Sequence, residues 1–444
     1  MKRQFEEYLK KWKDSKDRKP LLLRGARQVG KTYLLKQFAQ ENFEHIVYVS
    51  FDDDRYLDDT LSVTLNPDHI LDAVEKQTHI PIIEGKTIVI FDEIQENSRA
   101  LTSLKYFNEN KPGLHIVASG SALGVLQHKG FSFPVGKVDT QYLKPLSFLE
   151  FVNSIEGEDY TNILSDVDAM PRFRTKLEEL LKLYFYVGGM PEVVRNFIEN
   201  KNYKLVKTLQ KRILDDYFAD FSKYTGTHFN AKLQAIWNSI PKQTARENKK
   251  FKYSEVKKGS RADDYLAHIQ WLQNSALIYK TVATYTPKIP LKFYEETTIF
   301  KIFICDVGLF GAMMNVHSRT ILEGNALFTE YKGALAEQYI CQQLFNSNDS
   351  IFYWTTEKST NEIDFLMEAW NTSVPVEVKS GFNTQAKSLK VFREKYQPKL
   401  SFRLSLNDYN KSDDLIDLPL YAAHLIPQII EAYNKNELSA LNNK

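Results

Sequence analysis

The sequence predicts an α/β protein that begins with a parallel sheet, continues through a helical region and ends in further strands and helices. Three observations lead to this prediction. A short apolar run at 20–23 leads into a glycine loop and a helix-like segment. A continuous apolar run at 87–91 ends in two acidic residues. Strand-like and helix-like segments alternate up to residue 150, which is typical of a parallel sheet.

Composition sets the frame for this prediction. The chain has 444 residues, enough for roughly two to four domains, and its net charge of +2 neither requires nor excludes nucleic acid. Its two cysteines, Cys305 and Cys341, belong to no CxxC pair, so we expect no disulfide framework or cysteine zinc site. No run of about 18 apolar residues is present, and the polar segment 1–19 lacks the apolar centre of a secretory signal. We therefore expect a cytoplasmic protein without a membrane span.

The glycine loop carries the strongest motif. Residues 25–32 read GxxxxGKT between an apolar strand-like run and a helix-like segment, which is the context of a P-loop. Glycines let the backbone N–H groups curl around phosphate oxygens, and the following helix N-terminus favours the same anion. Lys31 can reach the β- and γ-phosphates, and the Thr32 hydroxyl can ligate Mg²⁺. The predicted ATP-binding residues are Gly25, Ala26, Arg27, Gln28, Val29, Gly30, Lys31 and Thr32.

Two further strands bring polar residues to the same edge of the predicted sheet. The apolar run 87–91 ends in Asp92, which we expect to hold Mg²⁺ beside Thr32, and in Glu93, the candidate base for the attacking water. A solvated acidic loop is the alternative. The run 114–118 leads to Ser119, which could sense the γ-phosphate or belong to an ordinary Ser-Gly-Ser turn.

The middle of the chain is predicted to be helical from Phe148 to about Tyr224 because its apolar residues recur at spacings of three and four. One break, Gly188-Gly189-Met190-Pro191, indicates a rigid turn between helices. The residues alone leave two interpretations open for this turn. It either contacts the nucleotide or simply connects two helices.

A basic segment follows at 242–261, where eight Lys or Arg stand against two Glu, a local excess of +6. A helix is predicted to start at Ser260, with Asp263 in a capping box, and a strand-like run follows at 276–282. Helix, turn, helix and strands is the order of a winged helix, a common duplex-binding module. We predict DNA as the partner, with a solvated face or a protein-binding winged helix as the alternative.

A second candidate site lies in two strand-like runs, 361–367 and 374–381. Glu377 and Lys379 are two positions apart and so share one face of a strand, and a hairpin would bring Asp364 to them. Glu337, on a helix predicted at 331–345, is a further candidate ligand. Carboxylates with a lysine suit metal-assisted phosphodiester hydrolysis, so Asp364, Glu377 and Lys379 are candidate catalytic residues and Asp364, Glu377 and Glu337 candidate metal ligands. This pattern also arises by chance.

Taken together, the chain resembles a family of bacterial and archaeal AAA-type ATPases with a C-terminal domain of unknown function related to restriction endonucleases. Besides 24–32, the resemblance rests on several short segments. They are Phe91-Asp92-Glu93-Ile94-Gln95, Ser119-Gly120-Ser121, Leu143-Lys144-Pro145-Leu146-Ser147-Phe148, Gly188-Gly189-Met190-Pro191, Asp306-Val307-Gly308-Leu309, Glu362-Ile363-Asp364-Phe365 and Val376-Glu377-Val378-Lys379.

The resemblance implies a P-loop NTPase domain at 1–150, a helical lid at 151–228, a winged-helix domain at 229–298 and a restriction-endonuclease-like α/β domain at 299–444. It also favours Pro191 as a nucleotide contact. One departure stands out, since family members usually have Gly-Arg where this chain has Gly136-Lys137. Lys137 keeps the charge but loses the planar guanidinium, which predicts slower hydrolysis if that position acts on the γ-phosphate.

The leading hypothesis is an ATP- and Mg²⁺-dependent ATPase that couples nucleotide state to DNA binding or processing, with a C-terminal nuclease as its further activity. The alternative is an ATP-dependent regulatory switch whose C-terminal domain is an inactive binding module. A small-molecule kinase is a weaker alternative because no second substrate motif accompanies the P-loop. The sequence does not indicate an oligomeric state.

Overall fold

The computed structural model describes residues 1–121, 134–246, 249–318, 328–348, 350–358, 360–382 and 385–442. The chain forms two compact units. The first contains Met1–Lys144 with Gln270–Leu277, and the second contains Pro145–Ile269 with Ile278–Lys444. Within the described residues no helix is long and apolar enough to cross a membrane.

The first unit is built on a five-stranded sheet in the order β2-β3-β4-β1-β5, with every neighbouring pair parallel. The predicted parallel sheet is thus confirmed. Its elements in chain order are α1 (Phe5–Asp14), β1 (Leu21–Arg24), α2 (Lys31–Asn42), β2 (His45–Ser50), α3 (Tyr56–Val63), α4 (Pro67–Thr78), β3 (Thr87–Asp92), the 3-10 helix η1 (Ile94–Glu96), α5 (Ser98–Asn110), β4 (His115–Gly120) and β5 (Asp139–Tyr142).

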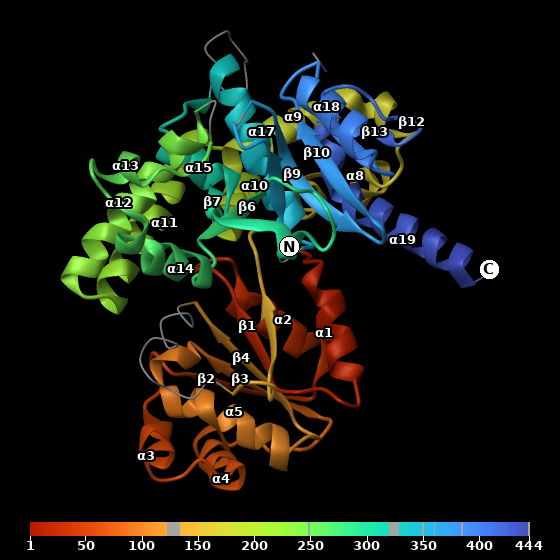
Figure 1. The fold of residues 1–444 in the computed structure, drawn as a ribbon. Helices are drawn as coiled ribbons and strands as arrows, with labels where there is room; N and C mark the ends of the chain where they lie inside the picture. Colours follow the sequence, from red (N-terminus) through yellow and green to blue (C-terminus); the bar gives the residue numbers. More distant parts are fainter. Residues whose placement is uncertain are drawn as a thin grey trace. The chain divides into compact units, whose positions relative to one another are not determined.

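Helices cover this sheet on both faces, with α3, α4 and α5 on one side and α1 and α2 on the other (Figure 1). Strands buried on both faces need apolar residues at nearly every position, which explains the continuous run of β3. The core under α3–α5 joins Val89 and Phe91 of β3 to Leu104 and Phe107 of α5. The parallel arrangement brings the carboxyl ends of β1, β3 and β4 to one edge.

The second unit begins with helices. They are α7 (Phe148–Glu156), α8 (Glu158–Leu164), η2 (Met170–Phe173), α9 (Arg174–Val187), α10 (Pro191–Asn200), α11 (Tyr203–Tyr224), α12 (Thr227–Thr244), α13 (Tyr253–Val256), η3 (Ala262–Asp264) and α14 (Leu266–Asn274), whose last residues belong to the first unit. The predicted helical region is therefore present. The helix expected from Ser260 begins at Leu266 instead, and Asp264, not Asp263, accepts the capping bond from the Arg261 N–H.

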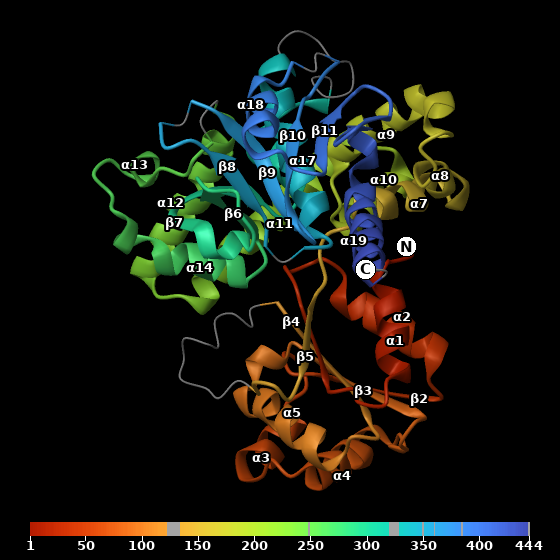
Figure 2. The same ribbon diagram turned by 45° about the vertical axis from the view of Figure 1, so that its right-hand side comes forward.

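An eight-stranded mixed sheet forms the rest of the second unit, in the order β12-β13-β11-β10-β9-β8-β6-β7. Its elements are β6 (Ile278–Thr284), η4 (Leu291–Tyr294), β7 (Glu295–Ile304), α15 (Val307–Met313), α17 (Phe328–Phe345), β8 (Phe352–Thr355), β9 (Glu362–Ala369), β10 (Thr372–Val378), α18 (Lys387–Tyr396), β11 (Ser401–Ser405), β12 (Asn410–Ser412), β13 (Leu415–Pro419), η5 (Leu420–Leu425) and α19 (Ile426–Asn442). Figure 2 shows β8–β11 side by side in this sheet.

The strands β6 and β7 tie the predicted winged-helix segment to the C-terminal strands. They pair with each other antiparallel, and β6 also pairs in parallel with β8. The boundary predicted between 298 and 299 falls inside β7. The helices of 229–274 and these strands follow the order expected of a winged helix, but the strands continue a larger sheet.

Three segments quoted for the resemblance meet in the second unit at the Gly188–Gly189 turn. The Gly189 N–H donates to Asp306 Oδ2 at 2.6 Å, and the Gly189 carbonyl accepts from the Leu146 N–H at 2.7 Å. Gly188 has φ of 75°, and a Cβ there would overlap the Asp306 carboxylate. Asp306 is fully buried, which raises its pKa to about 6 although backbone N–H groups favour its charged form. The turn is therefore held by one hydrogen bond to the Asp306 side chain and one to the Leu146 backbone.

Candidate functional sites

The P-loop connects β1 to α2 as predicted, and its glycines adopt conformations that other residues rarely take. Gly25 has φ of 153° and Gly30 has φ of 91°. A Cβ on Gly25 would overlap the Leu143 carbonyl oxygen, so the loop passes too close to that backbone for a side chain. Ala26 and Val29 are buried beneath the loop.

Lys31 starts α2 and turns its ammonium group back into the loop. Its Nζ donates to the carbonyls of Gly25 and Ala26, each at 3.0 Å, and the residue is only 6% exposed. These bonds place the positive charge within the curl of the loop, where the motif expects phosphate oxygens. Arg27 and Gln28 complete the loop, and Gln28 also has a positive φ, of 67°.

Asp92 is the centre of a hydrogen-bond network at the carboxyl ends of the strands. Its Oδ2 accepts from Thr32 Oγ1 at 2.7 Å and from the Tyr48 hydroxyl at 2.8 Å. Its Oδ1 accepts from Ser119 Oγ. Ser119 lies within β4, so the alternative of an ordinary turn is wrong for this residue. Burial, followed by the charge of Asp92, raises the pKa of Tyr48, which keeps its hydroxyl a donor.

Glu93 follows Asp92 in a left-handed conformation with φ of 50°. This backbone turns the chain away from β3, and the Glu93 N–H donates to Asp92 Oδ1 at 3.1 Å. The Gln95 side chain donates to Glu93 Oε2 at 2.5 Å and so orients the carboxylate. Sequence reasoning missed the roles of Gln95 and Tyr48, although Gln95 lies in a segment that carried the resemblance.

Lys137, which replaces the arginine of the resemblance, pairs with Glu109 at 2.9 Å. Both side chains are more than a third exposed, at 39% and 35%. At the surface of the first unit, the ammonium group of Lys137 is thus paired with the Glu109 carboxylate.

The predicted hairpin of the second candidate site is present as the antiparallel pair β9 and β10. Asp364 Oδ2 accepts from the Val378 N–H at 2.8 Å, and Lys379 Nζ pairs with Glu377 Oε1 at 2.7 Å. Glu337 reaches the same cluster from α17, since its charge acts on both Asp364 and Glu377. The structure therefore brings all four predicted residues together.

Two further lysines belong to this cluster, and sequence reasoning did not assign them to it. Lys249 pairs with Glu337 Oε1, and Lys301 of β7 pairs with Glu362 at 2.5 Å. In the sequence Lys249 contributes to the basic segment 242–261, and Lys301 carries no local signal. We call the seven charged residues the carboxylate–lysine cluster: Lys249, Lys301, Glu337, Glu362, Asp364, Glu377 and Lys379.

The carboxylates of the cluster respond differently to burial. Burial raises the pKa of Asp364, and the charges of Glu337 and Glu377 raise it well above its usual range. Burial also raises the pKa of Glu377, against the opposing effect of Lys379. For Glu337 burial acts in the same direction, but Lys249 and Lys301 outweigh it and the pKa ends below its ordinary value. The lysines thus hold the charge of Glu337.

The carboxylate–lysine cluster offers two oxygens to a divalent metal ion. Within the described ranges, no three His, Cys, Asp or Glu side chains are arranged to hold a metal ion together. Glu337 and Glu377 nevertheless each bury one oxygen, Oε2, for which the part of the chain that the structure describes supplies no hydrogen-bond partner. Oxygens of this kind suit Mg²⁺ or Mn²⁺, so the donor set fits a metal through these two residues.

Pro191 is the first residue of α10 in the second unit, and Met190 separates it from the Gly188–Gly189 turn. Proline suits this position because its missing N–H would have no partner within the helix. The predicted contact of Pro191 with nucleotide stays a prediction.

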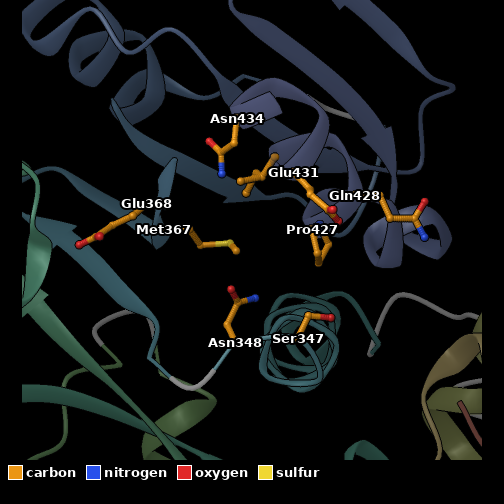
Figure 3. A pocket seen from close by; sticks show the side chains of 9 residues that line it. Ser347, Asn348, Met367, Glu368, Pro427, Gln428, Glu431 and Asn434 are labelled. Carbon is orange, nitrogen blue, oxygen red and sulfur yellow. The ribbon is translucent and has the colours of Figure 1, made fainter. Parts of the chain in front are cut away.

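A separate cavity of about 520 Å³ lies between β9 and α19 (Figure 3). It is lined by Ser347, Asn348, Met367, Glu368, Pro427, Gln428, Ile430, Glu431 and Asn434. Several of its polar groups are engaged, since Glu431 pairs with Lys435 at 2.7 Å and Asn434 accepts from the Trp370 N–H at 2.7 Å. The cavity contains none of the predicted site residues.

Comparison with known families places the P-loop in a recognised domain. Residues 17–152 match an AAA domain. Residues 178–320 and 332–421 match two domains of unknown function, DUF8612 and DUF4143. No curated protein matches the chain. Residues 17–152 are therefore an AAA-type P-loop ATPase domain, while the matches to the second unit state no activity.

Solved structures give more distant likenesses. A Walker-type ATPase of Pyrococcus abyssi is 17% identical with a TM-score of 0.43, over 70% of this chain and 95% of that one. A Drosophila ORC structure bound to AT-rich DNA is 14% identical with a TM-score of 0.24, over 70% and 91%. C. elegans PCH-2 is 14% identical with a TM-score of 0.23, over 38% and 46%. At these scores the likenesses are too remote to support a functional argument.

Proposed function

We propose that the protein binds ATP with Mg²⁺ at the P-loop, hydrolyses it slowly and couples the nucleotide state to DNA binding or processing by the second unit. The hydrogen bond between Thr32 and Asp92 carries the first part of this proposal. It joins the glycine loop to a strand end 60 residues further on, as a nucleotide site requires.

In the proposed ATP hydrolysis, the residues of the first unit have different roles. The loop N–H groups and Lys31 bind the phosphates, while Thr32 and Asp92 provide oxygens for Mg²⁺. When bound, Mg²⁺ neutralises charge on the β- and γ-phosphates. Glu93 accepts a proton from water or orients it, and Gln95 holds the Glu93 carboxylate. Tyr48 and Ser119 hold Asp92 in one orientation.

ATP binding and turnover of purified variants test these roles. Lys31→Ala removes the buried ammonium group and should abolish ATP binding, whereas Lys10→Ala, an exposed change on α1, should bind ATP as the wild type does. Glu93→Gln should bind ATP but lower turnover by roughly 10²-fold or more, because a positioned general base contributes about that factor. Normal turnover in Lys31→Ala would refute the P-loop assignment, and normal turnover in Glu93→Gln would remove the base role.

For the carboxylate–lysine cluster we propose metal-dependent phosphodiester hydrolysis. The two unpartnered buried oxygens of Glu337 and Glu377 favour this function. These residues would hold the metal, which when bound supplies Lewis-acid stabilisation of the leaving oxygen. Asp364, whose pKa is raised by the charges of both, would act beside them as a neighbouring carboxylate, and Lys379 would position water. An inactive binding module, with the lysines as permanent partners of the carboxylates, is the alternative.

Incubation with plasmid or branched DNA in Mg²⁺ or Mn²⁺ distinguishes the two. Cleavage that is lost in Asp364→Asn supports hydrolysis at the cluster. Cleavage that survives this change, or its absence from the wild type, favours the binding module.

The proposed DNA binding depends on the basic segment 242–261. Some of the positive charges of this segment are paired with carboxylates of the protein itself. Lys242 and Arg246 both pair with Glu255, and Lys249 is turned into the cluster. Exposed residues such as Lys257 and Lys258 remain for phosphate contacts. Affinity for duplex DNA should fall as salt rises. An affinity that does not change with salt would count against this surface.

A further inference from the structure

Lys249 differs from the other basic residues of its segment in where its charge lies. Its side chain is 13% exposed and pairs with Glu337, which is 8% exposed. The side chains of Lys242 and Arg246, in contrast, are 72% and 39% exposed. Moving a lysine from water into a buried site costs free energy unless a carboxylate compensates it. Lys249 therefore belongs to the buried ion pairs of the cluster and not to the exposed basic surface.

The backbone beside Lys249 is fixed on β7. The Phe251 N–H donates to the Phe300 carbonyl at 2.8 Å, and the two rings stack with centroids 5.5 Å apart and planes 16° from parallel. The Lys252 N–H donates to the Gln243 side chain at 2.7 Å. The backbone just after Lys249 is thus held against β7, the strand that also carries Lys301, while the stem of a lysine is intrinsically flexible.

The cluster contains four carboxylates and three ammonium groups. Lys301 of β7 pairs with Glu362 of β9, and Lys379, the residue just after β10, pairs with Glu377 of β10. Lys249 comes instead from the connection between α12 and α13, and it takes one oxygen of Glu337, while Oε2 of that residue has no hydrogen-bond partner among the described residues. An ammonium group and a divalent ion both seek carboxylate oxygen, so they compete at Glu337.

We propose that Lys249 is a tethered cation that occupies Glu337 in place of a divalent metal ion and is displaced when the metal binds. The inference rests on the proposed metal site of the carboxylate–lysine cluster and assigns a residue that controls its loading. It predicts that the cluster binds metal more weakly with Lys249 than without it, since the ammonium group holds Oε1 of Glu337 and its positive charge repels the ion.

Titration of the full chain with Mn²⁺ by calorimetry, without nucleotide, tests this inference. Lys249→Met keeps the buried stem and removes the charge, and it should tighten Mn²⁺ binding by at least about tenfold. Lys242→Met, in the same segment but largely exposed, should bind as the wild type does. If Lys249→Met does not fold, Lys249→Gln replaces it. Glu377→Gln, combined with each protein, identifies the binding that belongs to the cluster.

Three outcomes are distinct. Tighter binding in Lys249→Met that Glu377→Gln abolishes supports the inference. Binding that is sensitive to Glu377→Gln but equal in wild type and Lys249→Met overturns the role of Lys249 and keeps the metal site. Absence of any Glu377-dependent binding in both proteins overturns the metal site itself, and the inference with it.

Discussion

Replacing Gly189 by alanine is the most direct test of the turn that joins three segments of the second unit. A Cβ at this position would overlap the Leu146 carbonyl oxygen and lie 2.8 Å from the Leu146 nitrogen and 3.1 Å from its carbonyl carbon. All three are backbone atoms, so no side chain can rotate away. The turn must open, and the Leu146 N–H then loses its 2.7 Å bond to the Gly189 carbonyl.

The expected cost follows from these contacts. Forcing a methyl group into a packed site costs about 1–3 kcal/mol, and a buried N–H without a partner costs about 1–3 kcal/mol more. We therefore expect Gly189→Ala to lower the free energy of unfolding of the second unit by about 2–6 kcal/mol. Urea unfolding gives the total, and hydrogen exchange of the Leu146 amide reports the turn itself.

Gly226→Ala is the matched control in the same unit. Gly226 has φ of −71°, and a Cβ there meets no atom within 4 Å. Alanine fits this conformation and restricts the unfolded chain, but Gly226 is the N-cap of α12, where alanine is less favourable than glycine; stability should therefore stay within about 1 kcal/mol of the wild type. Equal stability of the two variants, with unchanged exchange at Leu146, would show that our reading of the turn is wrong.

Three further predictions concern the first unit. Burial lowers the pKa of His115 to about 4, so between pH 6.5 and 4 the unfolded chain binds a proton that the folded chain does not. The free energy of unfolding should therefore fall by up to about 3 kcal/mol as the pH drops through this window. In urea unfolding, His115→Gln should make the free energy of unfolding depend less on pH. Asn97→Ala removes the side chain that caps α5 and should cost about 1–2 kcal/mol in the same assay, whereas Asn97→Ser should restore most of it. Tyr48→Phe removes one donor to Asp92 and should slow ATP turnover several-fold, a cost of about 1 kcal/mol, with an unchanged rate arguing against its positioning role.

Local chemistry explains why the P-loop unit was accessible to sequence reasoning. The motif at 25–32 constrains backbone, charge and neighbouring elements within a few residues, and β3 reads as one continuous apolar run. The partners of Asp92 were less accessible. Tyr48 acts from β2, the neighbouring strand, and only the register of Tyr48 with Ile90 brings its hydroxyl to the end of β3.

In the second unit, local sequence patterns do not predict which distant segments pair. The pairing of β6 with β8 joins segments about 70 residues apart, and no pattern at 278–284 indicates it. The carboxylate–lysine cluster also depends on residues that are far apart in the sequence. Glu377 and Lys379 are visible as alternate positions of one strand, but the neighbours that decide their chemistry, Lys249 and Lys301, arrive from distant parts of the chain.

The turn at Gly188 and Gly189 also sets a rule for dividing this protein into pieces. A fragment that starts after residue 191 would contain Asp306 without the Gly189 amide that it accepts from, and a fragment that ends before 306 would leave that amide without its carboxylate. Either truncation therefore removes one partner of the hydrogen bond between the Gly189 backbone amide and the Asp306 side-chain carboxylate. Transplanting the C-terminal strands into another protein would therefore require residues 145–191 to travel with them.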